Sequence, residues 1–305
     1  MSNVFLGTSE FAATVLRRLA SSERQRPALV VTPPDSRRGR GRKLAPPPAA
    51  AAAQELGIAL LQAEDVNAEP VRERIAAAQP RAVLVCAFGQ LIREPLLSAH
   101  LMLNVHPSLL PRWRGAAPIE RAIMAGDERT GVCVMQLVAA LDAGPVGLRS
   151  EVGVGEETDF EALSTTLAEL GGELLIEALE LEAEGRLEFE QQDELAVTYA
   201  EKIEPGERRL DPARPAAELA AQVRALTPHI GAYLELVGGE RLGVRRAHAV
   251  DSELATGTIE PDEAGEALLL GCGAGVLRLE LVQPPGGKPM PADAFLRGHP
   301  LPQLP

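Results

Sequence analysis

A short apolar run from Leu101 to Val105 stops at a proline, and this stop constrains the fold more than any other feature of the chain. The run predicts a buried β-strand, and Pro107 cannot donate to a strand ladder, so the strand should end before it. Asn104 and His106 are two residues apart, which puts both side chains on the same face of that strand. The two polar groups therefore point to a ligand site at the carboxyl end of a strand, where open α/β sheets bind ligands. On spacing alone, a second interpretation stays open, in which both side chains only cap a turn.

Length and composition narrow the class of protein. A chain of 305 residues with 46% hydrophobic residues is typical of a globular protein with two domains. No apolar run approaches about 18 residues, so we expect no membrane span. The start, Asn3 to Gly7, has the pattern of a strand and not of a signal segment. The three cysteines form no C-x-x-C pair, which favours reduced thiols in the cytoplasm over disulfides or a zinc site.

The first two thirds of the chain alternate between strand and helix patterns. Apolar runs predict strands over residues 4–6, 29–32, 58–61, 82–87, 101–105 and 131–138. Helical spacing predicts helices near residues 11–19, 49–56, 71–77, 119–125 and 159–184. Thr8 or Ser9 is a suitable N-cap for the first helix. This alternation predicts an α/β fold with a doubly wound, mostly parallel sheet, although the G-x-G-x-x-G pattern of a dinucleotide site is absent.

The pattern changes after Thr198. Residues 201–210 have the composition of a linker, and a helix over 216–226 is followed by four short strand patterns at 232–237, 242–250, 267–270 and 276–282. Short strands between Gly- and Pro-rich turns predict a small OB-like β-barrel. We therefore expect a catalytic domain over residues 1–200, a linker over 201–210 and a smaller domain over 211–305.

A basic stretch near the N-terminus carries a second functional signal. Residues 33–48 hold five prolines, two glycines and no core face, so they predict an exposed loop. The loop's cations are Arg37, Arg38, Arg40, Arg42 and Lys43. Arginines spaced by glycine suit phosphate contacts, although the net charge of −13 argues against nucleic acid for the chain as a whole. A solvated loop without a ligand is the alternative interpretation.

Several catalytic templates do not fit the sequence. The G-x-S-x-G elbow, the P-loop and the His or Cys spacings of metal sites are all missing. What remains is Asn104 and His106 at one strand end and Asp142 in the loop after the next strand. An Asn amide can stabilise a developing oxyanion, and a His beside a carboxylate can donate or relay a proton. These residue types suit acyl transfer onto an amine without a metal.

At these residues the sequence resembles the methionyl-tRNA formyltransferase family. The resemblance covers nearly the whole chain and includes the stretch from Asn104 to Ile119. It also includes shorter motifs at Val4–Thr8, Arg38–Leu44, Ala87–Gln90, Leu141–Pro145, Gln192–Glu194, Thr198–Ile203 and Phe295–His299. The pattern Asn-x-His with a downstream Asp is shared by enzymes that use formyltetrahydrofolate. The arginine loop and the C-terminal region are more specific to this family.

The resemblance implies a Rossmann-like formyltransferase domain that moves the formyl group of 10-formyltetrahydrofolate onto methionyl initiator tRNA. It implies Asn104, His106 and Asp142 as catalytic residues, and Arg37–Lys43 and the C-terminal barrel as contacts to tRNA. It implies a folate site lined by Phe88, Gly89, Gln90, Ser108, Leu109, Leu110 and Pro111. The protein would be a cytoplasmic monomer without a metal.

Three other functions stay open from the residues. A formyltransferase for a small amine, such as a nucleotide or an amino sugar, would share the three catalytic residues but would not need the arginine loop or residues 208–305. A formyltetrahydrofolate hydrolase would use water in place of the amine. A non-catalytic RNA-binding protein would depend on the barrel alone.

Overall fold

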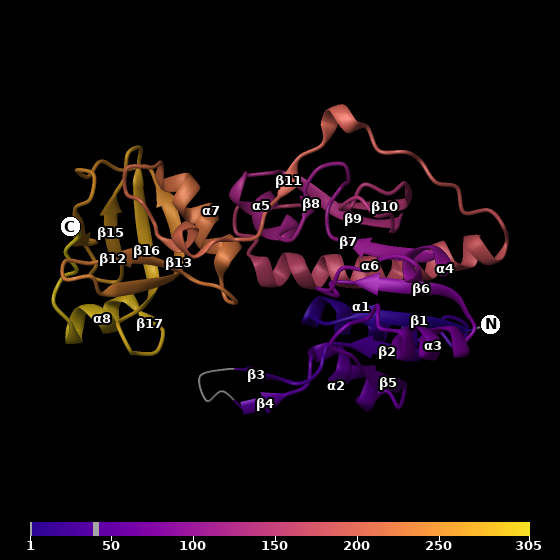
Figure 1. The fold of residues 1–305 in the computed structure, drawn as a ribbon. Coiled ribbons are helices and arrows are strands. Elements are labelled where there is room, and N and C mark those ends of the chain that lie inside the picture. Colours follow the sequence, from indigo (N-terminus) through magenta and orange to yellow (C-terminus); the bar gives the residue numbers. More distant parts are fainter. Residues whose placement is uncertain (1, 39–42) are drawn as a thin grey trace. The chain divides into compact units, whose positions relative to one another are not determined.

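The computed structural model describes residues 2–38 and 43–305, and the chain divides into two compact units (Figure 1). The first unit consists of Met1–Gly115, Arg129–Val152 and Ser164–Tyr199. The second consists of Ala116–Glu128, Gly153–Leu163 and Ala200–Pro305. Two short segments from the first two thirds of the sequence thus pack with the C-terminal part. The expected domains, residues 1–200 and 211–305, are each one continuous stretch of sequence, and this division stays a prediction.

The first unit is built on one seven-stranded sheet. Its strands are β1 (Ser2–Gly7), β2 (Pro27–Thr32), β5 (Ala59–Gln62), β6 (Pro80–Cys86), β7 (Met102–His106), β9 (Arg129–Gln136) and β10 (Val146–Gly153). Their order in the sheet is β10-β9-β7-β6-β1-β2-β5. β5, β2, β1, β6 and β7 run parallel in that sequence, whereas β9 is antiparallel to β7. Four of the parallel strands, β1, β2, β6 and β7, are mostly buried, as expected where helices cover a sheet, whereas the edge strand β5 is partly exposed.

Helices connect and cover these strands. They are α1 (Glu10–Ala20), α2 (Pro48–Glu55), α3 (Glu69–Ala77), α4 (Leu96–Ala99) and α6 (Phe160–Ala183). Ser9 caps α1, since its side chain accepts a hydrogen bond from the Ala12 N–H. Two glycines of α6 allow a close approach: a Cβ at Gly171 would lie 2.7 Å from a methyl of Val105 in β7. The longest helix therefore packs tightly against the strand that carries Asn104 and His106.

The basic stretch is more regular than predicted. β3 (Ser36–Arg38) and β4 (Lys43–Ala45) form an antiparallel ribbon in which Arg37 pairs with Leu44 and Arg38 with Lys43. The expected loop is thus a hairpin over its described residues. The side chains of Ser36, Arg37, Lys43 and Leu44 in this ribbon are exposed, as a stretch without a core face should be. Gly39, Arg40, Gly41 and Arg42 lie outside the described residues.

The second unit has a sheet of antiparallel strands around its own core. The strands are β12 (Ala232–Glu235), β13 (Arg241–Val250), β14 (Ile259–Pro261), β15 (Leu268–Gly271), β16 (Val276–Gln283) and β17 (Met290–Pro291). Their order is β12-β13-β16-β15-β14, with β17 beside β16. The helices of this unit are α5 (Pro118–Met124), η2 (Pro205–Arg208), α7 (Ala216–Leu226) and α8 (Ala292–Gly298). Leu219, Val223 and Leu226 of α7 are buried in the core with Leu234 and Leu242 of the sheet.

These two sheets confirm the predicted fold class, a mostly parallel sheet followed by a smaller C-terminal domain of antiparallel strands. No helix in the described ranges is both long enough and apolar enough to cross a membrane. The sequence patterns missed β10, β14 and α8, which are short or only partly buried.

Candidate active site

Asn104 and His106 lie at the carboxyl end of β7 with their side chains on one face. Cross-strand pairing places Asn104 opposite Met135 and His106 opposite Cys133 of β9. β6 flanks β7 on its other edge, so the end of β7 sits inside the sheet rather than at its border. Both side chains are buried, with Asn104 at 8% and His106 at 4% exposure. The strand ends at His106, one residue before the proline, as the sequence predicts.

The Asn104 amide has no protein partner in the described part of the chain. No hydrogen bond of its side chain occurs among residues 2–38 and 43–305, although the residue is largely buried. Buried amides normally find partners, because an unpaired amide loses the hydrogen bonds of water without compensation. The Asn104 N–H groups are therefore available to an acceptor on a ligand.

The His106 ring is held between a carbonyl and a carboxylate. Nε2 donates to the Trp113 carbonyl oxygen at 2.9 Å, since a carbonyl can only accept. Nδ1 lies 3.7 Å from Asp142 Oδ2. That separation is too long for a direct hydrogen bond. A water or a substrate group that touches both atoms can join them.

Asp142 lies in a loop of residues 141–146, which we call the Asp142 loop. Backbone contacts fix the conformation of this loop. The φ of Asp142 is +46°, in the left-handed region, which Asp tolerates better than most residues. The Gly115 N–H donates to its Oδ2 at 2.9 Å. Gly144 lies so close to β9 that a Cβ there would be 1.8 Å from the Gln136 carbonyl oxygen. We call Asn104, His106 and Asp142 the reaction cluster, because the fold brings His106 and Asp142 together at the end of the strand that carries Asn104.

A glutamine far along the chain fastens the Asp142 loop. Gln192 Nε2 donates to the carbonyl oxygens of Asp142 and Gly144 at 2.8 and 2.7 Å. Its Oε1 accepts from Arg114 Nε at 2.9 Å, and the same guanidinium makes two bonds to Glu194. Arg114 is 3% exposed, so these bonds satisfy a buried cation. The sequence contains Gln192 and Glu194 as part of the resemblance, but nothing in the local pattern predicts what they contact.

The residues expected to line a folate site fall into two groups. Ser108 and Leu110 face the interior: Ser108 Oγ donates to the Arg112 carbonyl oxygen, and Leu110 packs with Cys133, Met135 and Val146. Leu109 and Pro111 are half-buried and keep part of their surface accessible. A ligand can therefore contact the side chains of Leu109 and Pro111 and the backbone of residues 108–111.

The other expected folate segment follows β6. Phe88 is buried, and the Gln90 side chain is used within the protein, accepting from the Val66 N–H and donating to the Ala63 carbonyl oxygen. Gly89 has a φ of +79° and open space where a Cβ would be. A ligand can therefore approach the backbone at Gly89, which is the approach that glycine permits.

The expected tRNA contacts are only partly described. Arg37 and Lys43 are exposed on the β3–β4 ribbon, and the backbone of Arg38 continues β3. Arg40 and Arg42 lie outside the described residues. The ribbon and the reaction cluster both belong to the first unit.

The cysteines and the metal-ligating residues offer no second site in the described ranges. Burial raises the pKa of the Cys133 thiol to about 11 and that of Cys86 further, so both thiols are protonated near neutral pH. All three cysteines are free and buried. No group of three or more His, Cys, Asp or Glu with the geometry of a metal site occurs in the described part of the chain.

Comparison with known proteins places this geometry in a family. Residues 1–179 match the formyl transferase family, and residues 202–300 match its C-terminal domain. A methionyl-tRNA formyltransferase from Methylobacillus flagellatus is 45% identical over 99% of this chain and 97% of its own length. One from Cereibacter sphaeroides is 40% identical over 99% and 98%. The chain belongs to the methionyl-tRNA formyltransferase family.

Solved structures of low identity share the fold of this family member. HypX from Aquifex aeolicus in complex with tetrahydrofolic acid has a TM-score of 0.66 at 18% identity, covering 100% of this chain and 51% of its own. Methionyl-tRNA formyltransferase from Clostridium thermocellum has a TM-score of 0.59 at 14% identity, covering 82% of this chain and 94% of its own. At such identities the likeness concerns the fold alone.

Proposed function

We propose that this protein transfers the formyl group of 10-formyltetrahydrofolate to the α-amino group of methionyl initiator tRNA, giving N-formylmethionyl-tRNA for translation initiation. The observation that carries the proposal is the unpartnered Asn104 amide on the same strand as a His106 ring that the Trp113 carbonyl orients, with Asp142 Oδ2 3.7 Å from its Nδ1. An amide donor and a histidine–carboxylate pair are what acyl transfer to an amine requires. The relatives at 38–45% identity along the chain support this acceptor.

The transfer exchanges one C–N bond for another. The bond formed joins the α-amine nitrogen to the formyl carbon, and the bond broken joins that carbon to N10 of the folate. One proton leaves the attacking amine and one arrives on the departing nitrogen, so no oxidant or reductant is needed. In between, the formyl oxygen gains negative charge, which a donor positioned in advance stabilises.

Each member of the reaction cluster has a role in this exchange. The Asn104 amide donates to the formyl oxygen as its charge grows. Asp142 Oδ2 and His106 Nδ1, 3.7 Å apart, can both contact the attacking amine or a water beside it and move its proton. The Trp113 carbonyl keeps the imidazole in one orientation, because it accepts from Nε2.

The folate co-substrate suits the accessible groups beside the cluster. HypX is similar in fold to this chain and is described in complex with tetrahydrofolic acid. The open backbone at Gly89 and the half-buried Leu109 and Pro111 give a flat ring system apolar contact and backbone donors and acceptors. We propose Phe88, Gly89, Gln90 and Ser108–Pro111 as the segments that border it, mainly through backbone.

The tRNA is proposed to contact Arg37, Arg38, Arg40, Arg42 and Lys43 of the β3–β4 region. Arginines and lysines suit phosphates, and the described side chains of Arg37 and Lys43 are exposed. The three free, buried cysteines agree with a reducing compartment and so support a cytoplasmic location.

Incubation of the protein with methionyl initiator tRNA and 10-formyltetrahydrofolate tests the proposal. Hydrolysis of the aminoacyl ester should release formylmethionine, and parallel reactions with glycinamide ribonucleotide or an amino-sugar nucleotide should give no formylated product. Transfer to a small amine alone would replace the proposed acceptor. Release of free formate without any formylated amine would make the protein a hydrolase.

A further inference from the structure

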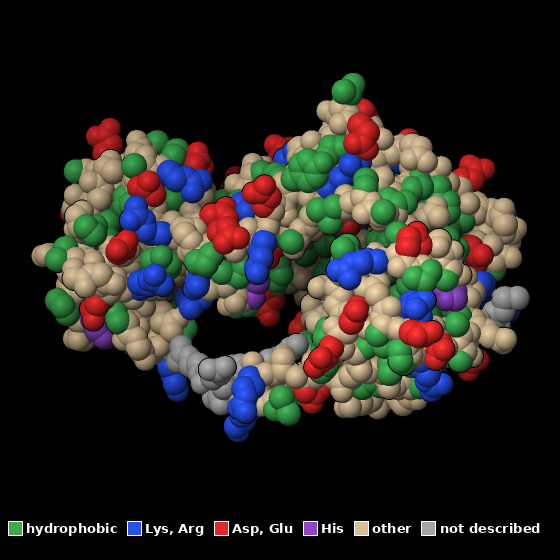
Figure 2. All heavy atoms as spheres, viewed as in Figure 1, with side chains coloured by type: hydrophobic (Ala, Val, Ile, Leu, Met, Phe, Trp, Pro, Cys, Tyr) green, Lys and Arg blue, Asp and Glu red, His purple; other side chains and the backbone are tan. Residues whose placement is uncertain are grey.

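A surface segment of the first unit, residues 192–199, reaches the reaction cluster near both of its ends, and we call this segment the strap. Its short helical turn η1 (Glu194–Ala196) projects outward, and Leu195 is 98% exposed. Figure 2 shows hydrophobic and acidic side chains where this turn projects, at the top of the view. Burial of apolar surface therefore contributes little to holding the strap. Hydrogen bonds hold it, and they lead to His106 and Asp142.

Thr198 joins the strap to residues 111–114 by three hydrogen bonds. Its hydroxyl oxygen accepts from the Trp113 N–H at 2.9 Å. Its carbonyl oxygen accepts from the Arg114 N–H at 2.9 Å, and its own N–H donates to the Pro111 carbonyl oxygen at 3.3 Å. Of these three bonds, the one to the hydroxyl depends on the side chain of Thr198. A substitution can therefore remove this bond and leave the two backbone bonds in place.

Trp113, the residue that the Thr198 hydroxyl holds, has an unusual backbone conformation. Its φ of +66° lies in the left-handed region, which is unfavourable for a residue with a large side chain. Such a conformation persists only where the surrounding structure holds it firmly. The bonds from Thr198 fix the N–H of Trp113 and the N–H of the next residue, so they hold the backbone on both sides of the strained position.

The Trp113 carbonyl determines which ring nitrogen of His106 carries the proton. It accepts from Nε2 at 2.9 Å, so the proton of the neutral ring lies on Nε2. Nδ1 is then an unprotonated acceptor, 3.7 Å from Asp142 Oδ2. An acceptor in this position can take the proton that leaves the attacking amine. The other neutral tautomer, with its proton on Nδ1, could not.

We propose that Thr198 is a positioning residue for His106 and acts through the Trp113 carbonyl, which rests on the function proposed above. Loss of its hydroxyl takes away an acceptor of the Trp113 N–H and lets the strained backbone relax. The carbonyl that selects the His106 tautomer then loses its fixed direction. The strap thus sets both partners of the proton transfer, since Gln192 holds the Asp142 loop in the same way.

Thr198→Val in the full-length protein tests the proposal, because valine keeps the branched shape of threonine and removes the hydroxyl. At saturating methionyl-tRNA and 10-formyltetrahydrofolate, we expect kcat to fall about 10-fold, because the proton acceptor is misplaced. The KM for methionyl-tRNA and the Kd measured by fluorescence anisotropy should stay within about twofold of the wild type. Thr198→Ala should lose kcat to the same extent. Thr198→Ser restores the acceptor and should keep kcat within about threefold of the wild type.

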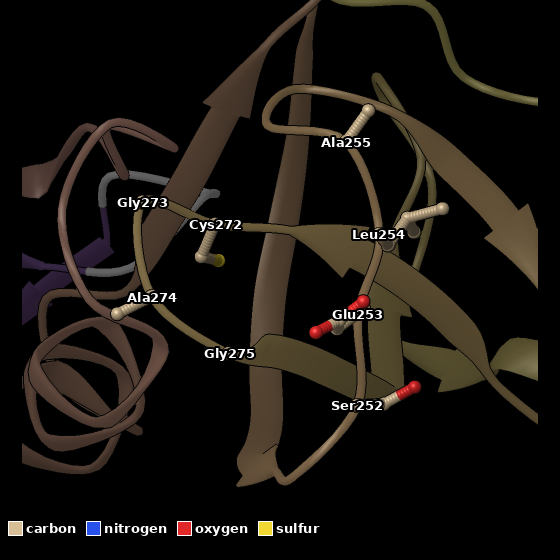
Figure 3. Close-up of a pocket in the computed structure, with 8 residues that line it drawn as sticks. All are labelled: Ser252, Glu253, Leu254, Ala255, Cys272, Gly273, Ala274 and Gly275. Carbon is tan, nitrogen blue, oxygen red and sulfur yellow. The ribbon is translucent and has the colours of Figure 1, made fainter.

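Thr256→Val is the matched control. It removes the same atoms, and Thr256 Oγ1 also bonds to backbone, donating to the Cys272 carbonyl oxygen at 3.1 Å. This bond links two loops of the second unit, residues 252–255 and 272–275, which face each other across a hollow of about 430 Å³ (Figure 3). Its kcat should stay within about twofold of the wild type. Equal losses of kcat in Thr198→Val and Thr256→Val would overturn the proposal.

Nitrogen NMR of the His106 ring measures the tautomer directly and does not depend on catalysis. Protein with isotope-labelled histidine gives ring signals for the five histidines of the chain, and a His106→Gln spectrum assigns those of His106. At alkaline pH, where imidazole is neutral, the wild type and Thr198→Ser should show one tautomer, with the proton on Nε2. Thr198→Val should show a mixture of both tautomers. Identical His106 signals in the wild type and Thr198→Val would overturn the proposal, whatever the value of kcat.

The two measurements separate this proposal from the proposed function. A wild type that forms no formylmethionyl-tRNA, but whose His106 tautomer changes in Thr198→Val, would refute the function and leave the positioning role. A wild type that formylates methionyl-tRNA, with neither kcat nor the His106 signals altered in Thr198→Val, would refute the positioning role alone.

Discussion

The reaction cluster and the β3–β4 ribbon, both in the first unit, hold their polar groups in different ways. In the cluster, His106 is fixed on one side by Trp113, and Asp142 is fixed by Gly115 and Gln192. In the ribbon, the side chains of Arg37 and Lys43 are exposed on two paired strands. In the first arrangement, hydrogen bonds fix the positions of individual polar atoms. In the second, exposed side chains provide positive charge over a wider surface.

This difference follows from what each site is proposed to do. Transition-state stabilisation needs donors that are already in place when the charge develops, because reorganisation would cost the energy gained. Contacts to phosphates gain energy from charge and counterion release, which tolerate side-chain motion. Changes in the cluster should therefore alter kcat, and changes in the ribbon should alter KM and its salt dependence.

A large effect on rate, equal to the one expected for a change at Asp142, is expected for Asn104→Ala. Loss of an oxyanion donor should lower kcat on the order of 10²–10³-fold with little change in the Kd for tRNA. Steady-state formylation and anisotropy on the same preparation measure the two quantities. If turnover stays near that of the wild type, Asn104 has no such role and the reaction cluster must be redrawn.

A smaller loss of rate is expected for Gln192→Ala. Two hydrogen bonds to the Asp142 loop disappear, each contributing about 1 kcal/mol, and the carboxylate loses its fixed position. We expect kcat to fall about 10- to 100-fold at unchanged KM for tRNA. Glu190→Ala is the control, because Glu190 is two residues away and its side chain pairs with the exposed Arg149. Equal losses in both variants would mean that the effect is one of local stability.

Arg40→Ala and Arg42→Ala should affect binding alone. Each should weaken tRNA binding about 3- to 10-fold and reduce its salt slope by about one phosphate contact, with kcat at saturation unchanged. Anisotropy titrations between low and moderate salt measure this. An unchanged slope would favour a solvated loop without a ligand.

The smallest effect is expected for Cys133→Ala, although Cys133 is the cross-strand partner of His106. Burial raises the pKa of this thiol to about 11, so it carries no thiolate near neutral pH to act as a nucleophile. We expect kcat within about threefold of the wild type and a loss of about 1–2 kcal/mol in the free energy of unfolding. A collapse of kcat in a stably folded variant would place Cys133 in the reaction.

Local patterns predicted the strand end at His106 and a cap at Thr8 or Ser9, of which the structure uses Ser9, because a proline and a capping hydroxyl act on their own neighbours. The alternation of apolar segments predicted the parallel sheet for the same reason. The antiparallel pairing of β9 with β7 was not predicted, since the direction of a strand depends on where the chain returns.

The remaining features depend on contacts between distant residues. Gln192 hydrogen-bonds to Asp142, which lies 50 residues earlier in the sequence. Likewise, α5 packs with α7 in the second unit rather than with its neighbours in sequence. Tyr233, Gly243 and Gln283 are cross-strand partners on three neighbouring strands, β12, β13 and β16. No window of sequence contains both partners of such contacts, so only the folded structure reveals them.

The charge of Asp142 is the most direct test of the reaction cluster. Asp142→Asn keeps the shape of the side chain and an oxygen that can accept from the Gly115 N–H, while it removes the carboxylate that faces His106. Under single turnover at saturating methionyl-tRNA, we predict a formylation rate lower by on the order of 10²–10³-fold with tRNA affinity unchanged. A rate equal to that of the wild type would contradict the assignment of the chemistry to Asn104, His106 and Asp142.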